Sequence, residues 1–353
     1  MSSEVATEPR SGLDPAAEGA RRAALRLAFG VTTCFALVEA LNWDVTFLAP
    51  LLAANMLVKM DRPPSLRQGF LIIVLFVLST GIVMVLTTAL ITKPVVLILA
   101  LTLLIYLTFY ANRRGAPDLA TLLLQVSAVS LPTIAVLSPE AAGSFATTLV
   151  LAGVLALLTT WAAHAAFPAP PAMVGGDTQT ENAKLRAEPT IAARDALLDT
   201  LILFPVLTWF ILDATMIAVV VLVTILTLLR LPDRKHGQRA ALGLILGNLF
   251  GGIAAAILYN LLLLNDTLLF FIVACLATSL IFAGRIVTAG DRAPISATAF
   301  AIFILLLGLG LSPLPGTSGE AFVSRLANVL LASAYAIGGL SLVEPWRIRA
   351  RGP

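Results

Sequence analysis

The sequence predicts an all-α, polytopic membrane protein with about 12 transmembrane helices, and three observations support this prediction. Hydrophobic residues make up 59% of the 353 residues and charged residues only 12%, against about 25% charged residues in a soluble domain. The apolar residues form long runs that approach the roughly 20 residues a helix needs to cross the hydrocarbon core. Basic residues are almost absent from every second gap between these runs: of the 23 Lys and Arg, only Lys93 and Arg325 lie in those gaps.

The apolar runs divide into two sets of six, separated by one long polar interval. Because Lys and Arg concentrate in cytoplasmic loops, their distribution places both termini and the polar interval in the cytoplasm. In chain order, the runs cover residues 24–41, 43–59, 69–91, 94–111, 118–137, 144–167, 195–212, 214–230, 240–264, 267–283, 296–312 and 323–343.

This map predicts how the chain is organised. Few residues remain outside the membrane, so a sizeable soluble domain is not expected. The predicted regions are a disordered cytoplasmic tail at 1–20, a first six-helix membrane repeat at 21–167, a cytoplasmic linker at 168–193, a second six-helix membrane repeat at 194–345 and a basic C-terminal tail at 346–353.

The two sets of runs share local sequence features, which predicts an internal duplication. Arg114-Gly115-Ala116-Pro117 follows the fourth run, and Arg292-Ala293-Pro294 follows the tenth. Leu137-Ser138-Pro139 ends the fifth run, and Leu311-Ser312-Pro313 ends the eleventh. Since six is even, both repeats would enter and leave on the same side, as parallel repeats, and transporters commonly bind substrate between repeats. The alternative is a duplication that only enlarges a bundle.

Ionisable residues inside the runs are few, and each costs about 2.5–3.5 kcal/mol on insertion scales. Arg26, one turn into the first run, either snorkels to the lipid headgroups or contacts a substrate. Asp199, one turn into the seventh run, lies on the same helix face as Asp195. It either forms a salt bridge, with Arg194 or a loop arginine, or carries protons. Glu39, near the outer end of the first run, is the second proton-coupling candidate and is otherwise an ordinary loop residue.

Three amide side chains fall within the second, fifth and ninth runs: Asn55, Gln125 and Asn248. An amide in hydrocarbon needs hydrogen-bond partners. Each of these residues therefore either joins neighbouring helices or lines a wet substrate path, and the sequence leaves both alternatives open.

The ninth run also carries Gly243, Gly247 and Gly251, which are spaced four residues apart. Small residues at this spacing let two helix backbones approach closely. The spacing predicts a tight seam, against either another helix of this chain or another subunit.

Motifs for enzyme chemistry are absent from the sequence, so the chain is not expected to be an enzyme. It contains no phosphate-binding Gly-x-x-x-x-Gly-Lys-Ser/Thr, no zinc-binding His-Glu-x-x-His and no Gly-x-Ser-x-Gly nucleophile elbow. No cofactor or metal ion is expected, because the two histidines are far apart. The basic residues are spread over many short loops as topology signals, so nucleic acid is not an expected partner.

Three features together suggest a known group of proteins. They are the basic start Arg21-Arg22-Ala23-Ala24-Leu25-Arg26, the outer-turn tryptophan in Leu41-Asn42-Trp43-Asp44, and the repetition of the six-run unit after a linker. In these features the chain resembles the fusaric-acid-resistance-like superfamily, which includes bacterial aromatic-acid exporters and plant aluminium-activated malate channels. The resemblance covers nearly the whole chain beyond residue 20 and is greatest to a compact twelve-span branch without large soluble domains.

The resemblance implies a function and partners. The chain would be an efflux transporter of the bacterial inner membrane that exports organic anions, above all aromatic ones, or drugs. It would work with a periplasmic membrane-fusion protein of the HlyD type, and the dimeric plant relatives imply a homo-oligomer. Whether this export is coupled to protons stays open, and the alternatives are an anion channel and a non-transporting structural or assembly subunit of an export complex.

The resemblance also gives roles to the residues singled out above. It makes the basic residues Arg22, Arg26 and Arg194 candidates for gathering anions at the cytoplasmic mouth. Independently of the resemblance, a transport mechanism would use the buried amides of Asn55, Gln125 and Asn248 to orient the carboxylate along the path. Asp199 and then Glu39 are the candidate groups for proton coupling.

Overall fold

The computed structural model describes residues 15–60, 62–168, 188–213, 217–230, 237–265, 267–290, 293–311 and 319–351. Within these ranges the chain is all-helical and contains no strand. The helices are α1 (Pro15–Ala40), α2 (Leu48–Lys59), α3 (Leu66–Leu90), α4 (Pro94–Arg113), α5 (Asp118–Leu137), α6 (Pro139–Ala166), α8 (Pro189–Leu212), α9 (Ile217–Leu229), α10 (Gly237–Leu264), α11 (Leu268–Thr288), α12 (Ala293–Leu311) and α13 (Gly319–Arg351).

Helix length and composition confirm a polytopic α-helical membrane protein. In the described part of the chain, nine helices are long and apolar enough to cross a membrane, and α2 and the 330–343 part of α13 are shorter apolar helices. Each predicted apolar run corresponds to one helix, and the run at 118–137 matches α5 at both ends.

The ends of the chain differ from the predicted regions. Helix α1 begins at Pro15, within the stretch expected to be a disordered tail, and a Glu18–Arg22 ion pair one turn apart supports its first turns. Helix α13 continues through Pro345 to Arg351, into the expected basic tail. Most of the predicted tail and linker, residues 1–14 and 169–187, lies outside the described residues.

Helices α2 and α9 are too short to span a bilayer on their own. They contain 12 and 13 residues, which corresponds to about 18–20 Å, against a hydrocarbon core of about 30 Å. The chain before α2 is a turn in which Asn42 adopts a positive φ of 49°, a conformation that Asn tolerates better than most residues. The ends of these two helices therefore need polar partners within the protein.

The helices pack as two groups with matching contacts, the first helix group (α1–α6) and the second helix group (α8–α13). In the first group, α2 packs against α6, α3 against α5 and α6, and α4 against α5. In the second, α9 packs against α13, α10 against α12 and α13, and α11 against α12. Helices α8 to α13, taken in order, therefore have the same neighbours within their group as α1 to α6 have within theirs, so that α2 corresponds to α9 and α3 to α10.

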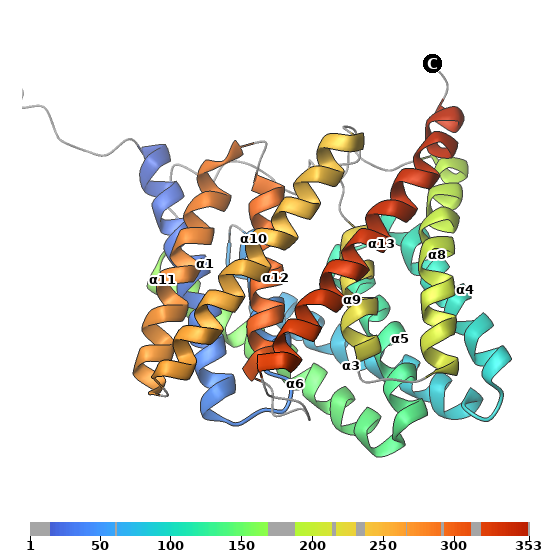
Figure 1. Ribbon diagram of the computed structural model, residues 1–353, viewed down its shortest axis with the longest axis horizontal. Helices are drawn as coiled ribbons and strands as arrows, with labels where there is room; N and C mark the ends of the chain where they lie inside the picture. The colour runs from blue at the N-terminus through green and yellow to red at the C-terminus, as the bar shows by residue number, and fades with distance from the viewer. Residues whose placement is uncertain are drawn as a thin grey trace, which may run out of the picture.

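Contacts between the two groups also come in matching pairs. Helix α1 packs against α11 and α4 against α8, at opposite ends of the molecule (Figure 1). Nearer the centre, α5 packs against α9 and α2 against α12. Helix α1 begins and α13 ends at the same, upper edge of the molecule in Figure 1.

The predicted glycine seam lies between two helices of this chain. A Cβ added to Gly251 of α10 would lie 2.3 Å from the backbone oxygen of Ala299 in α12, and one added to Gly247 would lie 3.0 Å from the oxygen of Ile295. The glycines therefore let α10 and α12 pack backbone to backbone, as the spacing indicated.

Candidate functional site: a charged cluster where three helix ends meet

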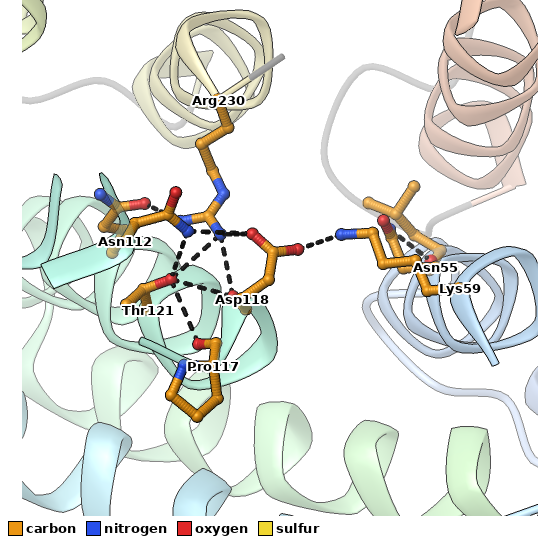
Figure 2. Close-up of polar contacts among 9 residues, drawn as sticks. Asn55, Lys59, Asn112, Pro117, Asp118, Thr121 and Arg230 are labelled. Atoms are coloured by element: carbon orange, nitrogen blue, oxygen red, sulfur yellow. Dashed lines mark hydrogen bonds and ion pairs between the residues drawn. The ribbon is translucent and has the colours of Figure 1, made fainter. Parts of the chain in front are cut away.

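Three helix ends that are far apart in the sequence meet around one carboxylate (Figure 2). Asp118 is the first residue of α5, Lys59 is the last residue of α2, and Arg230 directly follows α9. The Asp118 carboxylate forms ion pairs with both cations, Oδ2 with Lys59 and Oδ1 with Arg230. An acidic residue at a helix N-terminus and basic residues at helix C-termini complement the helix dipoles.

Neighbouring polar groups complete this arrangement. The Asn112 amide donates to Asp118 Oδ1 at 3.0 Å and to Thr121 Oγ1 at 2.9 Å. We call Lys59, Asn112, Asp118, Thr121, Gln125 and Arg230 the Asp118 cluster. It lies at the α5–α9 contact, where the two helix groups meet.

Arg230 makes four hydrogen bonds within the Asp118 cluster. Its guanidinium donates to Gln125 Oε1, to Asp118 Oδ1, to the Asp118 backbone oxygen at 2.8 Å and to Thr121 Oγ1 at 3.1 Å. The Arg230 side chain is 8% exposed, whereas that of Asp118 is 45% exposed. The Arg230 side chain is therefore buried, whereas the carboxylate that it pairs with is open to the surroundings.

Gln125 brings an unused hydrogen-bond donor to the cluster. Its side chain is fully buried, and its Oε1 accepts from Arg230. Its Nε2 has no hydrogen-bond partner in the described structure, which costs about 1–3 kcal/mol for a buried polar group. Further along α5, the buried hydroxyls of Ser127 and Ser130 are also without a partner there. The interior of α5, the most deeply buried candidate span, thus carries spare polar groups.

A small cleft adjoins the cluster between α2 and α5. It is lined by Asn55, Met56, Lys59, Met60, Asp118, Leu119 and Leu122 and has a volume of about 30 Å³. That volume accommodates water molecules but is far below the roughly 300 Å³ of a small-molecule site. In this conformation the cleft is closed to an organic ligand.

A second charged cluster joins α4 to α8. Arg113, the last residue of α4, pairs with Asp199 and lies 3.4 Å from Asp195 Oδ2. The Asp195 and Asp199 side chains are 5% and 0% exposed. The sequence left open whether Asp199 forms a salt bridge. In the structure it does, and its partner is Arg113 at the end of α4 and not Arg194. We call these three residues the Arg113 cluster.

The structure brings two of the predicted path residues, Gln125 and Asn55, to the Asp118 cluster. Gln125 belongs to it directly, and Asn55 lines the adjoining cleft, although its amide donates to the Leu51 backbone oxygen of its own helix at 2.9 Å.

The predicted mouth arginines lie elsewhere. Arg22 pairs with Glu18 and donates to the Pro168 backbone oxygen at 3.2 Å, and Arg194 donates to the backbone oxygen of Trp346. Arg26 is buried within α1. Arg22 and Arg194 thus connect chain segments to one another, and none of the three arginines is among the residues of the Asp118 cluster.

Two other predicted residues are also separate. Asn248 is buried in α10, which packs against α11, α12 and α13, and its amide nitrogen and oxygen have no partner in the described structure. Glu39 is half-buried near the end of α1, which packs against α11.

The central residues of both clusters were not singled out from the sequence. Lys59, Arg113, Asp118 and Arg230 stand at the ends of apolar runs, where basic residues also serve as topology signals. Asp118 offered a usable signal, because it opens the fifth apolar run directly after Pro117. A carboxylate at that position fits a helix N-terminus, but its partners come from α2 and α9 and cannot be identified from local sequence.

The fold and composition define a multi-pass α-helical membrane protein, and comparison with known proteins adds one match. Residues 23–163 match the model of a family described as "Protein of unknown function (DUF2955)". The matched residues run from within α1 to near the end of α6, and so cover the first helix group only. No curated protein and no solved structure matches the chain significantly.

Proposed function

We propose that this chain is a transporter that moves organic anions, above all aromatic carboxylates or anionic drugs, out of the cell. The observation that carries the proposal is the buried Arg230 guanidinium, which meets the buried amide of Gln125 at the contact between the helix groups. A buried cation next to a spare amide donor provides recognition for an anion, and apolar helices around them suit an aromatic ring.

The proposed path follows the junction of two parallel six-helix repeats. The matching helix contacts of the two groups support the duplication, and so does a family match that coincides with the first group. The basic residues support a cytoplasmic location for both termini and for the Asp118 cluster. Transporters with such repeats bind substrate between them.

Export of an anion needs no additional coupling in principle. Moving one negative charge out of a negative interior releases about 2.3 kcal/mol per 100 mV of membrane potential. The resemblance to aromatic-acid exporters supports a location in the bacterial inner membrane, a homo-oligomer and a periplasmic membrane-fusion partner of the HlyD type. The chain acts in this proposal as a carrier or channel, and not as an enzyme.

One observation favours a second candidate, a structural or assembly subunit without a path of its own. Asn55 bonds within its own helix, and Asn248 and Arg26 lie on helices that do not carry the Asp118 cluster. Polar residues that only join helices would be scattered in this way. A flux measurement separates the two candidates directly.

Flux of an aromatic anion through the purified protein tests the proposal. In proteoliposomes with a potassium diffusion potential, we expect wild-type protein to carry benzoate above the flux through protein-free vesicles. Arg230→Gln removes the buried charge and should lower this flux about tenfold or more, since charge-assisted hydrogen bonds contribute about 1.5–3 kcal/mol. Arg67→Gln, which removes an exposed charge at the start of α3, should transport like the wild type. A wild-type flux equal to that of empty vesicles contradicts transport and favours the structural subunit.

Proton coupling is proposed to act through Asp199, with Glu39 as the second candidate. Because Asp199 is paired with Arg113 in this structure, proton uptake by Asp199 requires this ion pair to separate during the transport cycle. We expect acid on the destination side to accelerate benzoate flux by the wild type, and Asp199→Asn to lose the acceleration while keeping the flux without a gradient. Glu188→Gln, an exposed position before α8, is the matched control. An unchanged response in Asp199→Asn eliminates this residue and moves the test to Glu39→Gln.

A further inference from the structure

The Asp118 carboxylate accepts hydrogen bonds at the position where an anionic ligand would meet the cations of the cluster. We infer that Arg230, Lys59 and Gln125 form a binding site for the carboxylate of an organic anion, and that Asp118 is a built-in competitor for it. A carboxylate arriving from the side on which Asp118 is exposed would take its place on Arg230. This inference rests on the proposed function and specifies which residues bind the substrate.

The hydrogen-bond donors around Asp118 suit a carboxylate. Its two oxygens receive the Lys59 ammonium on one side, and the Arg230 guanidinium and the Asn112 amide on the other. A guanidinium presents donors in a planar fork that matches the two oxygens of a carboxylate. A ligand carboxylate can therefore use the same donors that Asp118 uses.

The Gln125 amide is an independent sign of a ligand. Its Oε1 is held by Arg230, and its Nε2 is a fully buried donor without a partner in the described structure. Internal ion pairing alone gives no reason for such a donor, since buried polar groups are normally hydrogen-bonded. An incoming carboxylate on Arg230 would supply the acceptor that Asp118 does not provide.

A ligand carboxylate can replace Asp118 on Arg230 because these two residues differ in their exposure to solvent. Asp118 and Lys59 are half-exposed, and ion pairs at such positions are weak because water screens them, whereas Arg230 is buried. Asp118 can thus leave Arg230 and be solvated, while the guanidinium stays in place and needs a new anion. An uncompensated buried charge is strongly unfavourable, so departure of Asp118 and arrival of the ligand are coupled.

The exchange would also open the junction. The adjoining cleft of about 30 Å³ cannot hold an aromatic ring, and the Lys59–Asp118 ion pair joins the end of α2 to the start of α5. Displacing Asp118 breaks this connection and frees α2 to move away from α5. Ligand binding and access from this face thus become one event.

Binding of benzoate to the purified full-length protein in lipid nanodiscs tests whether Asp118 competes with a ligand carboxylate. Asp118→Asn removes the competing charge with almost no change in shape, and we expect it to bind benzoate about tenfold or more tightly than wild type. Neutral benzamide should show no such gain. Arg230→Gln should weaken benzoate binding at least about tenfold, because it removes the principal cation. The charge-matched controls Glu188→Gln and Arg67→Gln should bind like wild type.

Each outcome of this binding experiment decides the inference. If wild type binds benzoate and Asp118→Asn binds it equally or more weakly, Asp118 is an internal ion-pair partner only. This outcome overturns the competitor role of Asp118 and leaves the proposed transport function in place. If neither wild type nor Asp118→Asn binds benzoate, both this inference and the proposed function are overturned. Tighter binding by Asp118→Asn together with loss in Arg230→Gln supports the inference.

Opening of the cleft provides a second readout in a protein that keeps the whole cluster. Leu122 lines the cleft, and the natural cysteines, Cys34 and Cys275, are fully buried. In Leu122→Cys, we expect benzoate to speed the reaction with a water-soluble maleimide several-fold, and benzamide to leave the rate unchanged. Equal rates with and without saturating benzoate contradict the coupling between binding and opening.

Discussion

Replacing Arg113 with Leu is expected to destabilise the protein by about 3–5 kcal/mol, because breaking a buried ion pair leaves carboxylates buried without this cation. The affected groups are Asp195 and Asp199, whose side chains are almost completely inaccessible. Helix α4 would also lose its polar attachment to α8, one of the contacts between the helix groups. Equilibrium unfolding of the purified protein in mixed detergent micelles measures the change.

Two further variants distinguish electrostatics from lost packing. The triple variant Arg113→Leu, Asp195→Asn, Asp199→Asn removes the carboxylates as well, and we expect it to regain most of the lost stability. Arg67→Leu, at an exposed position, should change the free energy of unfolding by less than about 0.5 kcal/mol. If Arg113→Leu alone is as stable as wild type, the Arg113 cluster contributes nothing to joining the helix groups.

Gly251→Ala is expected to cost about 3 kcal/mol or more, at the upper end of what overpacking costs. The new Cβ would lie 2.3 Å from the Ala299 backbone oxygen, and a backbone carbonyl cannot move aside as a flexible side chain can. Helices α10 and α12 would have to separate along their seam. The free energy of unfolding in mixed micelles is again the measurement.

Other glycines of the chain supply the matched controls for this prediction. In the described part of the chain, no atom outside the adjoining turns of the same helix lies within 4 Å of a Cβ added to Gly81 in α3 or Gly284 in α11. Alanine at these positions should be neutral or slightly stabilising, since alanine favours the helix over glycine by about 1 kcal/mol. A loss in Gly251→Ala no larger than in Gly81→Ala would contradict a backbone-to-backbone seam.

Helix positions were predictable from the sequence because lipid imposes a simple rule. A spanning segment must satisfy its backbone internally and remain apolar over its length, so continuous apolar runs identify helices such as α5 at 118–137. The spacing of Gly243, Gly247 and Gly251 indicated the close packing of α10, although it could not identify α12 as the partner. Helix ends were less predictable, because the first turns of α1 are polar and depend on pairs such as Glu18–Arg22.

The candidate site was predictable only in part. Gln125 was singled out because an amide in hydrocarbon requires partners, and it is a member of the Asp118 cluster. Its partner Arg230 is 105 residues away in the sequence, and no local pattern connects them. Charges at the ends of apolar runs serve both topology and binding, and only the packing of α2, α5 and α9 shows that Lys59, Asp118 and Arg230 meet.

We propose that two six-helix bundles with the same orientation meet at the Asp118 cluster, and labelling from the two sides of the membrane decides whether their orientations agree. Single cysteines are introduced at exposed ends of corresponding helices, Lys93 after α3 and Asn265 after α10, and at Glu188 before α8. In sealed, oriented membranes, an impermeant maleimide should label the Lys93→Cys and Asn265→Cys variants from the same, outer side. Glu188→Cys should react only from the opposite side. Labelling of Lys93→Cys and Asn265→Cys from opposite sides would contradict parallel repeats and the path proposed between them.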